Sequence, residues 1–275
     1  MKRHQVQLPT LAVVSQLPNI ARTRAGNEFD PTLSRWKIRG DVDVLNINFD
    51  ALPPVSPILM FGFKSALLWC AEKNSLGTVS GMFQHIQRLL RHMSKATAMP
   101  LEIITSSDFL NFKTHLKPEA EWYASHVAGY LRSWHSLGYP GLDDDLMSTL
   151  RQLRLKGNPK GNAVRTMDPN GGPFTDIELQ TIQASLDHAY EHGQVGVQDY
   201  LIAWLFIMLG PRPVQLAALK LGDIVAERKP DGSVEYILRV PRAKQGHAHI
   251  RKELKERPLI PQIWTSPTPV DISDL

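Results

Sequence analysis

The sequence has little that would place it in a membrane or in a disulfide-stapled fold. Its 275 residues include a single cysteine, Cys70, so a disulfide framework is excluded, and the apolar run around Cys70 predicts a buried, inert thiol. No apolar run approaches the roughly 18 residues that a membrane span needs. Lys2, Arg3 and His4 are not followed by the continuous apolar stretch of a signal peptide. We therefore expect a cytoplasmic protein that does not contact membranes.

A large excess of one charge is also lacking. The 31 Lys and Arg residues and the 27 Asp and Glu residues give a net charge of +4, which permits nucleic-acid binding without requiring it. The distribution of charge is more informative. No acidic residue occurs between Lys73 and Leu101 or between Arg151 and Arg165, and residues 210–260 contain eleven Lys and Arg against six acids. These three segments are the candidates for contact with a polyanion.

Apolar periodicity and the positions of Gly and Pro divide the chain into four parts. Residues 1–54 contain scattered prolines and one strand-like alternation at 41–49, which predicts an N-terminal arm with at most a short strand. Residues 55–156 predict a domain of four or five helices, because apolar residues recur every three or four positions. The Gly-, Pro- and Asn-rich segment 157–173 predicts a linker, and residues 174–275 predict a second domain.

Capping signals mark helix starts in both predicted domains. Thr105 is followed by a helical pattern and can accept the otherwise unpaired first amides of a helix. Thr175 and Glu178 have the spacing of a capping box. The second domain is then expected to contain two helices and three strands, at residues 200–209, 213–221, 224–226, 234–240 and 257–260. The predicted fold class is mainly α with a small antiparallel β-sheet.

One predicted helix, at residues 82–95, separates basic from apolar side chains. The basic residues are spaced by three, four and three positions and therefore share one helix face: His85, Arg88, His92 and Lys95. The apolar residues line the other face: Met82, Ile86, Leu89, Leu90 and Met93. A cationic stripe of this kind suits a phosphate backbone, since neutralising the phosphates releases condensed counterions. An ordinary solvated face is the alternative interpretation.

The most specific motif spans residues 209–224 and reads Leu-Gly-Pro-Arg-Pro-Val-Gln-Leu-Ala-Ala-Leu-Lys-Leu-Gly-Asp-Ile. It resembles the first catalytic-arginine box of the tyrosine recombinase (phage integrase) family, with Gly two residues before the Arg and Leu-Lys-x-x-Asp-Ile leading into a strand. Residues 174–179, Phe-Thr-Asp-Ile-Glu-Leu, look like the opening of the family's catalytic domain. Residues 55–155 look like its SAM-like core-binding domain.

The resemblance implies a function in DNA integration or site-specific recombination. Arg212 would bind the non-bridging oxygens of the scissile phosphate, a task that suits the planar guanidinium. Lys244 would protonate the leaving deoxyribose oxygen, with Lys252 and Lys255 as alternatives. Arg242 would be a further DNA contact. The implied partners are double-stranded DNA at the bacterial nucleoid and other recombinase protomers on it, and the chemistry needs no metal or nucleotide cofactor.

The sequence also departs from the family pattern. Gln215 occupies a position that is often acidic, and Pro213 is an unusual neighbour for the arginine. The family's His-x-x-Arg box and tyrosine nucleophile follow the lysine, but the last tyrosine here is Tyr236. His85 to Arg88 fits the letters of that box but precedes Arg212, so we interpret it as a coincidence. These departures imply the first half of a catalytic domain, from a truncated, split or degenerate gene, that is inactive alone.

Two other function classes remain open at this stage. The first is a DNA-binding or regulatory protein that kept an integrase fold and lost the chemistry. The second is a metal-dependent hydrolase, for which His247 and His249 are the main hint, although a third ligand is not near them. The acidic run Asp143 to Asp145 is better explained as the N-terminus of a helix than as a metal site.

Overall fold

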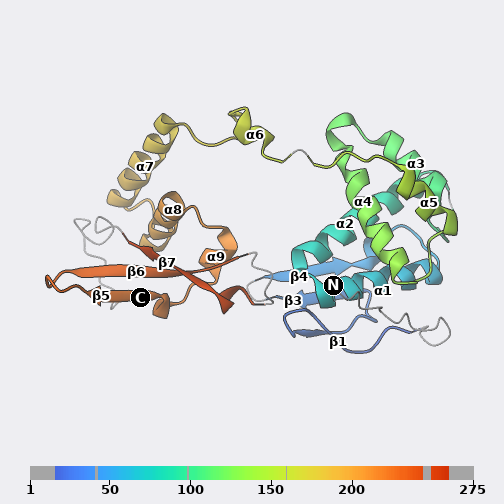
Figure 1. The fold of residues 1–275 in the computed structure, drawn as a ribbon, viewed down its shortest axis with the longest axis horizontal. Coiled ribbons are helices and arrows are strands. Elements are labelled where there is room, and N and C mark those ends of the chain that lie inside the picture. Colours follow the sequence, from blue (N-terminus) through green and yellow to red (C-terminus); the bar gives the residue numbers. More distant parts are fainter. Residues whose placement is uncertain (1–15, 41–42, 98, 159, 244–248, 260–275) are drawn as a thin grey trace, which may run out of the picture. The chain divides into compact units, whose positions relative to one another are not determined.

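A computed structural model describes residues 16–40, 43–97, 99–158, 160–243 and 249–259. The protein belongs to the α+β class, in which helices are combined with small antiparallel sheets, as the sequence predicts (Figure 1). The chain divides into two compact units, residues 1–159 and 160–275. The division falls within the segment 157–173 that was predicted to be a linker. None of the helices among the described residues combines the length and the hydrophobicity of a bilayer span.

The first unit begins with two β-hairpins. They are formed by β1 (Ala21–Arg22) with β2 (Glu28–Phe29) and by β3 (Arg35–Arg39) with β4 (Val44–Asn48), and a short 3-10 turn, η1 (Phe49–Ala51), follows. The strand predicted at 41–49 is present as β4, whereas the extended arm predicted for the remainder of residues 1–54 is wrong for its described part. Trp36 and Ile38 point inward from β3 and Ile47 from β4, and they pack in the same core as the helices. Burial of these side chains makes the hairpins an integral part of the unit.

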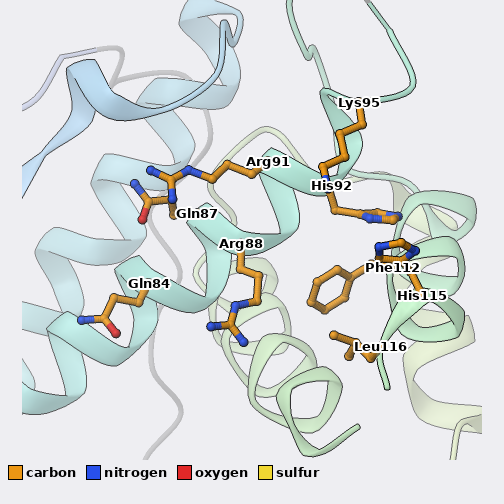
Figure 2. A pocket seen from close by; sticks show the side chains of 9 residues that line it. All are labelled: Gln84, Gln87, Arg88, Arg91, His92, Lys95, Phe112, His115 and Leu116. Carbon is orange, nitrogen blue, oxygen red and sulfur yellow. The ribbon is translucent and has the colours of Figure 1, made fainter. Parts of the chain in front are cut away.

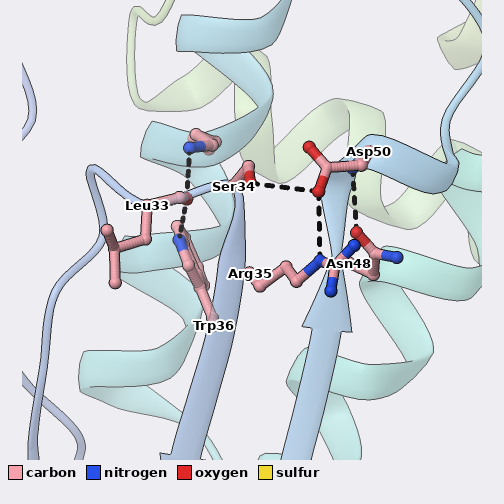
Figure 3. Close-up of polar contacts among 7 residues, drawn as sticks. Leu33, Ser34, Arg35, Trp36, Asn48 and Asp50 are labelled. Atoms are coloured by element: carbon pink, nitrogen blue, oxygen red, sulfur yellow. Dashed lines mark hydrogen bonds and ion pairs between the residues drawn. The ribbon is translucent and has the colours of Figure 1, made fainter.

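Polar contacts fix the turn that precedes β3 and the end of β4. The Trp36 indole N–H donates to the carbonyls of Pro31 and Leu33, at 3.1 and 3.2 Å. Asp50 accepts hydrogen bonds from the Ser34 hydroxyl and the Arg35 guanidinium, both at 3.1 Å (Figure 3). A buried tryptophan needs a partner for its N–H, and here two backbone carbonyls supply it.

Lys64, a buried lysine on the first helix, joins that helix to the same turn. Its ammonium group donates to the carbonyls of Thr32 and Leu33, at 3.1 and 2.7 Å, and lies 4.8 Å from the centre of the Phe49 ring. Burial lowers the pKa of Lys64. Since a buried ammonium is costly without hydrogen-bond acceptors, these carbonyls are what permit a lysine at this position.

Five α-helices form the rest of the described first unit, in agreement with the predicted four or five: α1 (Pro57–Lys73), α2 (Leu76–Met93), α3 (Ser106–His115), α4 (Trp122–Ser136) and α5 (Asp144–Gln152). A short 3-10 turn, η2 (Pro118–Ala120), precedes α4. The predicted cap is confirmed, because Thr105 and Asp108 form a capping box at the start of α3. Cys70 is buried in α1, and burial raises the pKa of its thiol to about 11. The helix α5 begins at the acidic run 143–145, with Asp143 at its N-cap.

The second unit contains helices followed by a three-stranded sheet. The helices are α6 (Asn162–Arg165), α7 (Asp176–Glu191), α8 (Val197–Leu209) and α9 (Pro213–Ala217), and the antiparallel strands are β5 (Ile224–Arg228), β6 (Val234–Pro241) and β7 (Leu254–Pro258), with β6 central. Two 3-10 turns, η3 (Leu221–Asp223) and η4 (Ile250–Lys252), flank the sheet. The predicted capping box of Thr175 and Glu178 is present at the start of α7.

A partly buried ion pair links the two 3-10 turns of the second unit. Both guanidinium ends of Arg251 donate to the Asp223 carboxylate, at 2.6 and 2.7 Å, and Arg251 also donates to the carbonyl of Ala218 at 2.7 Å. Asp223 is only 3% exposed. The Arg251 hydrogen bonds lower the pKa of Asp223, so the carboxylate stays ionised and the pair stays closed.

Candidate nucleic-acid interface

A groove with a volume of about 610 Å³ runs along the polar face of α2 in the first unit (Figure 2). Its basic lining comes from Arg88, Arg91 and His92 of α2, from Lys95 just after α2, and from His115 of α3. The other lining residues are Gln84, Gln87, Phe112 and Leu116. No carboxylate lines the groove, so it presents hydrogen-bond donors and positive charge to an anion.

The two histidines of this groove lie against one another. Figure 2 shows His92 from α2 beside His115 from α3, and their ring centres are 4.8 Å apart. Burial, followed by the neighbouring His115 and Lys95, lowers the pKa of His92. The lowered pKa disfavours the charged form of His92, whereas the guanidinium groups of Arg88 and Arg91 keep their charge.

His85 does not belong to this cationic face, contrary to the prediction. The imidazole of His85 lies among ring side chains of α4, with its centre 5.2 Å from Tyr123 and 5.0 Å from His126. Burial, and next His126 and Arg88, lower the pKa of His85 to about 4. His85 is consequently a neutral ring at physiological pH, whereas Arg88, His92 and Lys95 all line the groove.

Sequence reasoning missed several groove residues. Arg91 follows Arg88 by three positions and precedes Lys95 by four, so the same helical spacing could have identified it. Gln84 precedes Arg88 by four positions, so the same spacing also places it on this face. His115 could not have been found in this way, because only the packing of α3 against α2 brings it to the groove.

A second cationic site lies in the second unit, around the arginine of the sequence motif. Arg212 lines a pocket of about 200 Å³ together with Arg242, Lys255 and Arg257. These side chains come from the start of α9, from the residue after β6, and from β7. The antiparallel register places Lys255 opposite Val240 and Arg257 opposite Leu238, which brings β7 next to the arginine motif. Arg242 is partly neutralised by Glu253, at 3.4 Å.

Gln215 attaches Arg212 to the sheet. The Gln215 amide oxygen accepts from the backbone N–H of Arg212 at 3.0 Å, and its amide nitrogen donates to the carbonyl of Pro241. The Arg212 guanidinium itself donates to the carbonyl of Ala243 at 3.2 Å. A carboxylate at position 215 could accept from Arg212 but could not donate to Pro241, which gives a physical reason for an amide here.

The structure treats the three candidate lysines differently. Lys244 lies outside the described residues. Lys252 belongs to η4, and Lys255 lines the pocket of Arg212. Of the two described candidates, Lys255 is the one that the fold brings to the motif arginine.

The metal-site hint receives no support from the described part of the chain. His247 lies outside the described residues, and His249 precedes η4. Among the residues that the structure describes, no cluster of three or more His, Cys, Asp or Glu side chains is arranged to hold a metal ion.

Comparisons with protein families, with curated proteins and with solved structures find no match for this chain.

Proposed function

We propose that this protein binds double-stranded DNA through phosphate contacts, as an integrase-like protein of the tyrosine recombinase type. The observation that carries the proposal is the convergence of Arg212, Arg242, Lys255 and Arg257 on one pocket of the second unit. Guanidinium groups bind phosphate oxygens in pairs and keep their charge at any physiological pH. The residues come from separate elements, so the cluster depends on the fold and not on one basic run of sequence.

The groove of the first unit supports the same proposal. Arg88 and Arg91 of α2 and Lys95 just after it are exposed and line the groove, and no carboxylate of the groove lining opposes them. Each phosphate that such a surface neutralises releases counterions, which makes binding depend steeply on salt. In this proposal each unit contributes an independent set of phosphate contacts.

For the complete recombination reaction, a guanidinium at Arg212 would stabilise the charge that develops on the phosphate oxygens. Lys244 and Lys255 are the two candidates for donating a proton to the leaving oxygen. The second candidate function is DNA binding without strand transfer. The hydrogen bond from the Arg212 side chain to Ala243 favours it, because the same contact gives that guanidinium a structural role.

Duplex binding is tested by a mobility shift across a salt series. The variant Arg88→Gln/Arg91→Gln/Lys95→Gln should weaken binding and reduce the slope of log K against log salt by about 2 to 3, close to one per lost phosphate contact. The matched control is Arg22→Gln/Lys37→Gln/Arg39→Gln, which removes three exposed cations of the hairpins. No binding at low salt, or an equal loss in both variants, would contradict the proposal.

Strand transfer is tested by trapping with a duplex that carries a bridging phosphorothiolate, whose cleavage leaves a covalent protein–DNA adduct. An adduct that Arg212→Gln abolishes supports the recombinase type. The sequence has no tyrosine after Tyr236, so the chain alone is expected to bind without forming an adduct. Salt-dependent binding without an adduct therefore supports the DNA binding that both candidate functions share.

A further inference from the structure

A partly exposed aromatic surface adjoins the cationic groove of the first unit. It is formed by Trp122, Tyr123 and Tyr130 of α4, with His126 exposed beside them. The rings of Trp122 and Tyr123 are stacked, with centres 3.8 Å apart and planes inclined by 28°. None of these three aromatic side chains is counted among the buried core, whereas Trp134 of the same helix is fully buried. The helix α4 therefore buries Trp134 and leaves Trp122, Tyr123 and Tyr130 partly exposed, with Tyr130 packed against the core.

Arg88 connects this aromatic surface to the groove. Its guanidinium carbon lies 3.7 Å from the centre of the Tyr123 ring, and the same side chain lines the groove. Figure 2 shows Arg88 and Arg91 leaving α2 in different directions, with Arg88 on the side away from Gln87 and Arg91. An anion bound by Arg88 is consequently adjacent to flat aromatic faces.

The ring of His85 extends the surface without adding charge. Its centre lies 5.9 Å from Tyr130 with the planes inclined by 26°, and 6.1 Å from Trp122. Because its pKa is lowered to about 4, His85 is a neutral ring at pH 7. His85 therefore adds a neutral ring to the aromatic surface, and the cation Arg88 lies at the edge of that surface.

Positive charge along a backbone track and aromatic faces beside it are the two features with which proteins bind unpaired nucleotides, because every base has a face that can stack. In double-stranded DNA the bases are stacked on each other, so their faces are not available to the aromatic side chains of a protein. Arg88 and Lys95 are seven positions apart, a distance of about 10 Å at the helical rise per residue, so the cations of the groove extend over more length than a single phosphate occupies.

We propose that the first unit binds unpaired nucleotides of single-stranded or locally opened DNA, with phosphates in the groove and at least one base stacked on the partly exposed ring of Trp122, which Tyr123 and Arg88 support from behind. This inference rests on the proposed function, since it assumes that the groove binds a DNA backbone. It adds a preference for unpaired bases that phosphate contacts alone do not provide.

The test compares oligonucleotides of equal charge with and without bases. Fluorescence anisotropy of the full chain is measured with a labelled 12-nucleotide oligothymidylate and with an abasic 12-mer that has the same phosphates. The wild type should bind the thymidylate roughly 5- to 30-fold more tightly, as expected for one or two stacked bases. Trp122→Leu should lose most of that ratio, and Trp122→Phe, which keeps an aromatic face, should regain most of it.

Phe174→Leu is the matched control, because it removes an aromatic side chain that is 66% exposed in the second unit. It should leave the ratio unchanged. Circular dichroism melting verifies that each variant is folded. Equal binding of the thymidylate and the abasic strand by the wild type would overturn the inference, as would an unchanged ratio in a folded Trp122→Leu.

Duplex binding measured in parallel separates this inference from the proposed function. If duplex DNA binds with the salt dependence of the groove and bases add nothing, the inference alone fails. If neither duplex nor single-stranded DNA binds at low salt, both fail.

Discussion

The helices α2 and α8 are built differently, and the difference extends to the units that contain them. Seven residues of α2 are buried, all on its apolar face, while its polar face forms the groove. The helix α8 is apolar along almost its whole length, yet it has no buried residue, and Ile202 and Phe206 are 46% and 37% exposed. The described residues of the second unit enclose a small core of Leu238, Val240 and Leu259.

An amphipathic helix with a partner on its apolar side completes a core, whereas a helix that is apolar all round needs partners on every side. Among the described residues, the apolar face of α2 in the first unit is covered by packing partners, whereas the apolar surface of α8 in the second unit is not fully covered. We therefore expect the first unit to be the more stable of the two, and each of the following predictions tests that ranking.

The largest difference is expected from the same substitution at two tryptophans. Trp134 is fully buried in the first unit, and its indole N–H donates to the carbonyl of Pro140 at 3.1 Å. Trp204 is partly exposed in the second unit, and its N–H donates to Asp187 at 3.2 Å. Trp134→Ala should cost about 4 kcal/mol of stability, and Trp204→Ala about half as much.

Hydrogen exchange during urea unfolding assigns each loss to its unit. The backbone amides of α1, α2 and α4 should also be protected longer than those of α7 and α8 in the wild type. An equal or larger loss for Trp204→Ala would contradict the ranking.

A smaller effect is expected from breaking the ion pair of the second unit. Asp223→Asn removes the negative charge that both ends of Arg251 contact, and should destabilise the second unit by about 2 to 3 kcal/mol. The control Glu235→Gln breaks an exposed ion pair with Lys229 and should cost less than about 1 kcal/mol. Urea unfolding followed by exchange in the sheet measures both, and equal losses would show that burial of Asp223 adds nothing.

The Asp223 pair also has a pH signature with a defined sign. Its folded pKa lies below the usual 3.8, so the stabilisation is complete above that value and is lost as pH falls through the lower folded pKa. Asp223→Asn should remove this acid-dependent part of the second unit's stability, visible as a smaller change in urea midpoint between pH 5 and pH 2.5.

The smallest effect concerns His85 in the first unit. Its pKa is about 4 when folded, below the 6.5 of an unperturbed histidine, so the unfolded chain binds the proton first. The stability of the first unit should therefore be undiminished above pH 6.5 and fall by about 1 to 2 kcal/mol towards pH 4, after allowance for solvent screening.

His85→Gln should remove this part of the pH dependence, measured as urea midpoints at pH 7.5 and 4.5. His135→Gln, at an exposed position of α4, is the control and should behave like the wild type. A His85→Gln variant with an undiminished pH dependence would contradict the neutral, packed imidazole.

The sequence predicted local structure well where one segment decides it. The caps at Thr105 and Thr175 depend on side chains three residues away, and both are present. The alternation at 41–49 predicted the strand β4, but its partner β3 was missed, because β3 lies in a segment rich in turn residues. Its strand character depends on a helical core that arises later in the chain.

The candidate sites follow the same rule. Helical spacing placed Arg88, His92 and Lys95 on one face, but it could not reveal that α4 covers His85. The motif identified Arg212, but the register of β6 and β7 is needed to bring Lys255 to it. In both sites some residues could be predicted from one segment of sequence, whereas the positions of the others depend on tertiary packing.

The contact between Lys64 and the turn before β3 has a consequence for the order of folding. The acceptor carbonyls of Thr32 and Leu33 precede Lys64 by about thirty residues, so they leave the ribosome before their donor does. Trp36 and Phe49 are likewise synthesised before the helices against which they pack, so they cannot be buried until those helices have formed. Short hairpins are barely stable alone. The strands β1 to β4, which precede α1 in the chain, can therefore fold stably only after α1 and α2 have emerged. Until then a chaperone would meet a strand-forming segment with exposed Trp36, Ile38 and Ile47 ahead of α1 in the nascent chain.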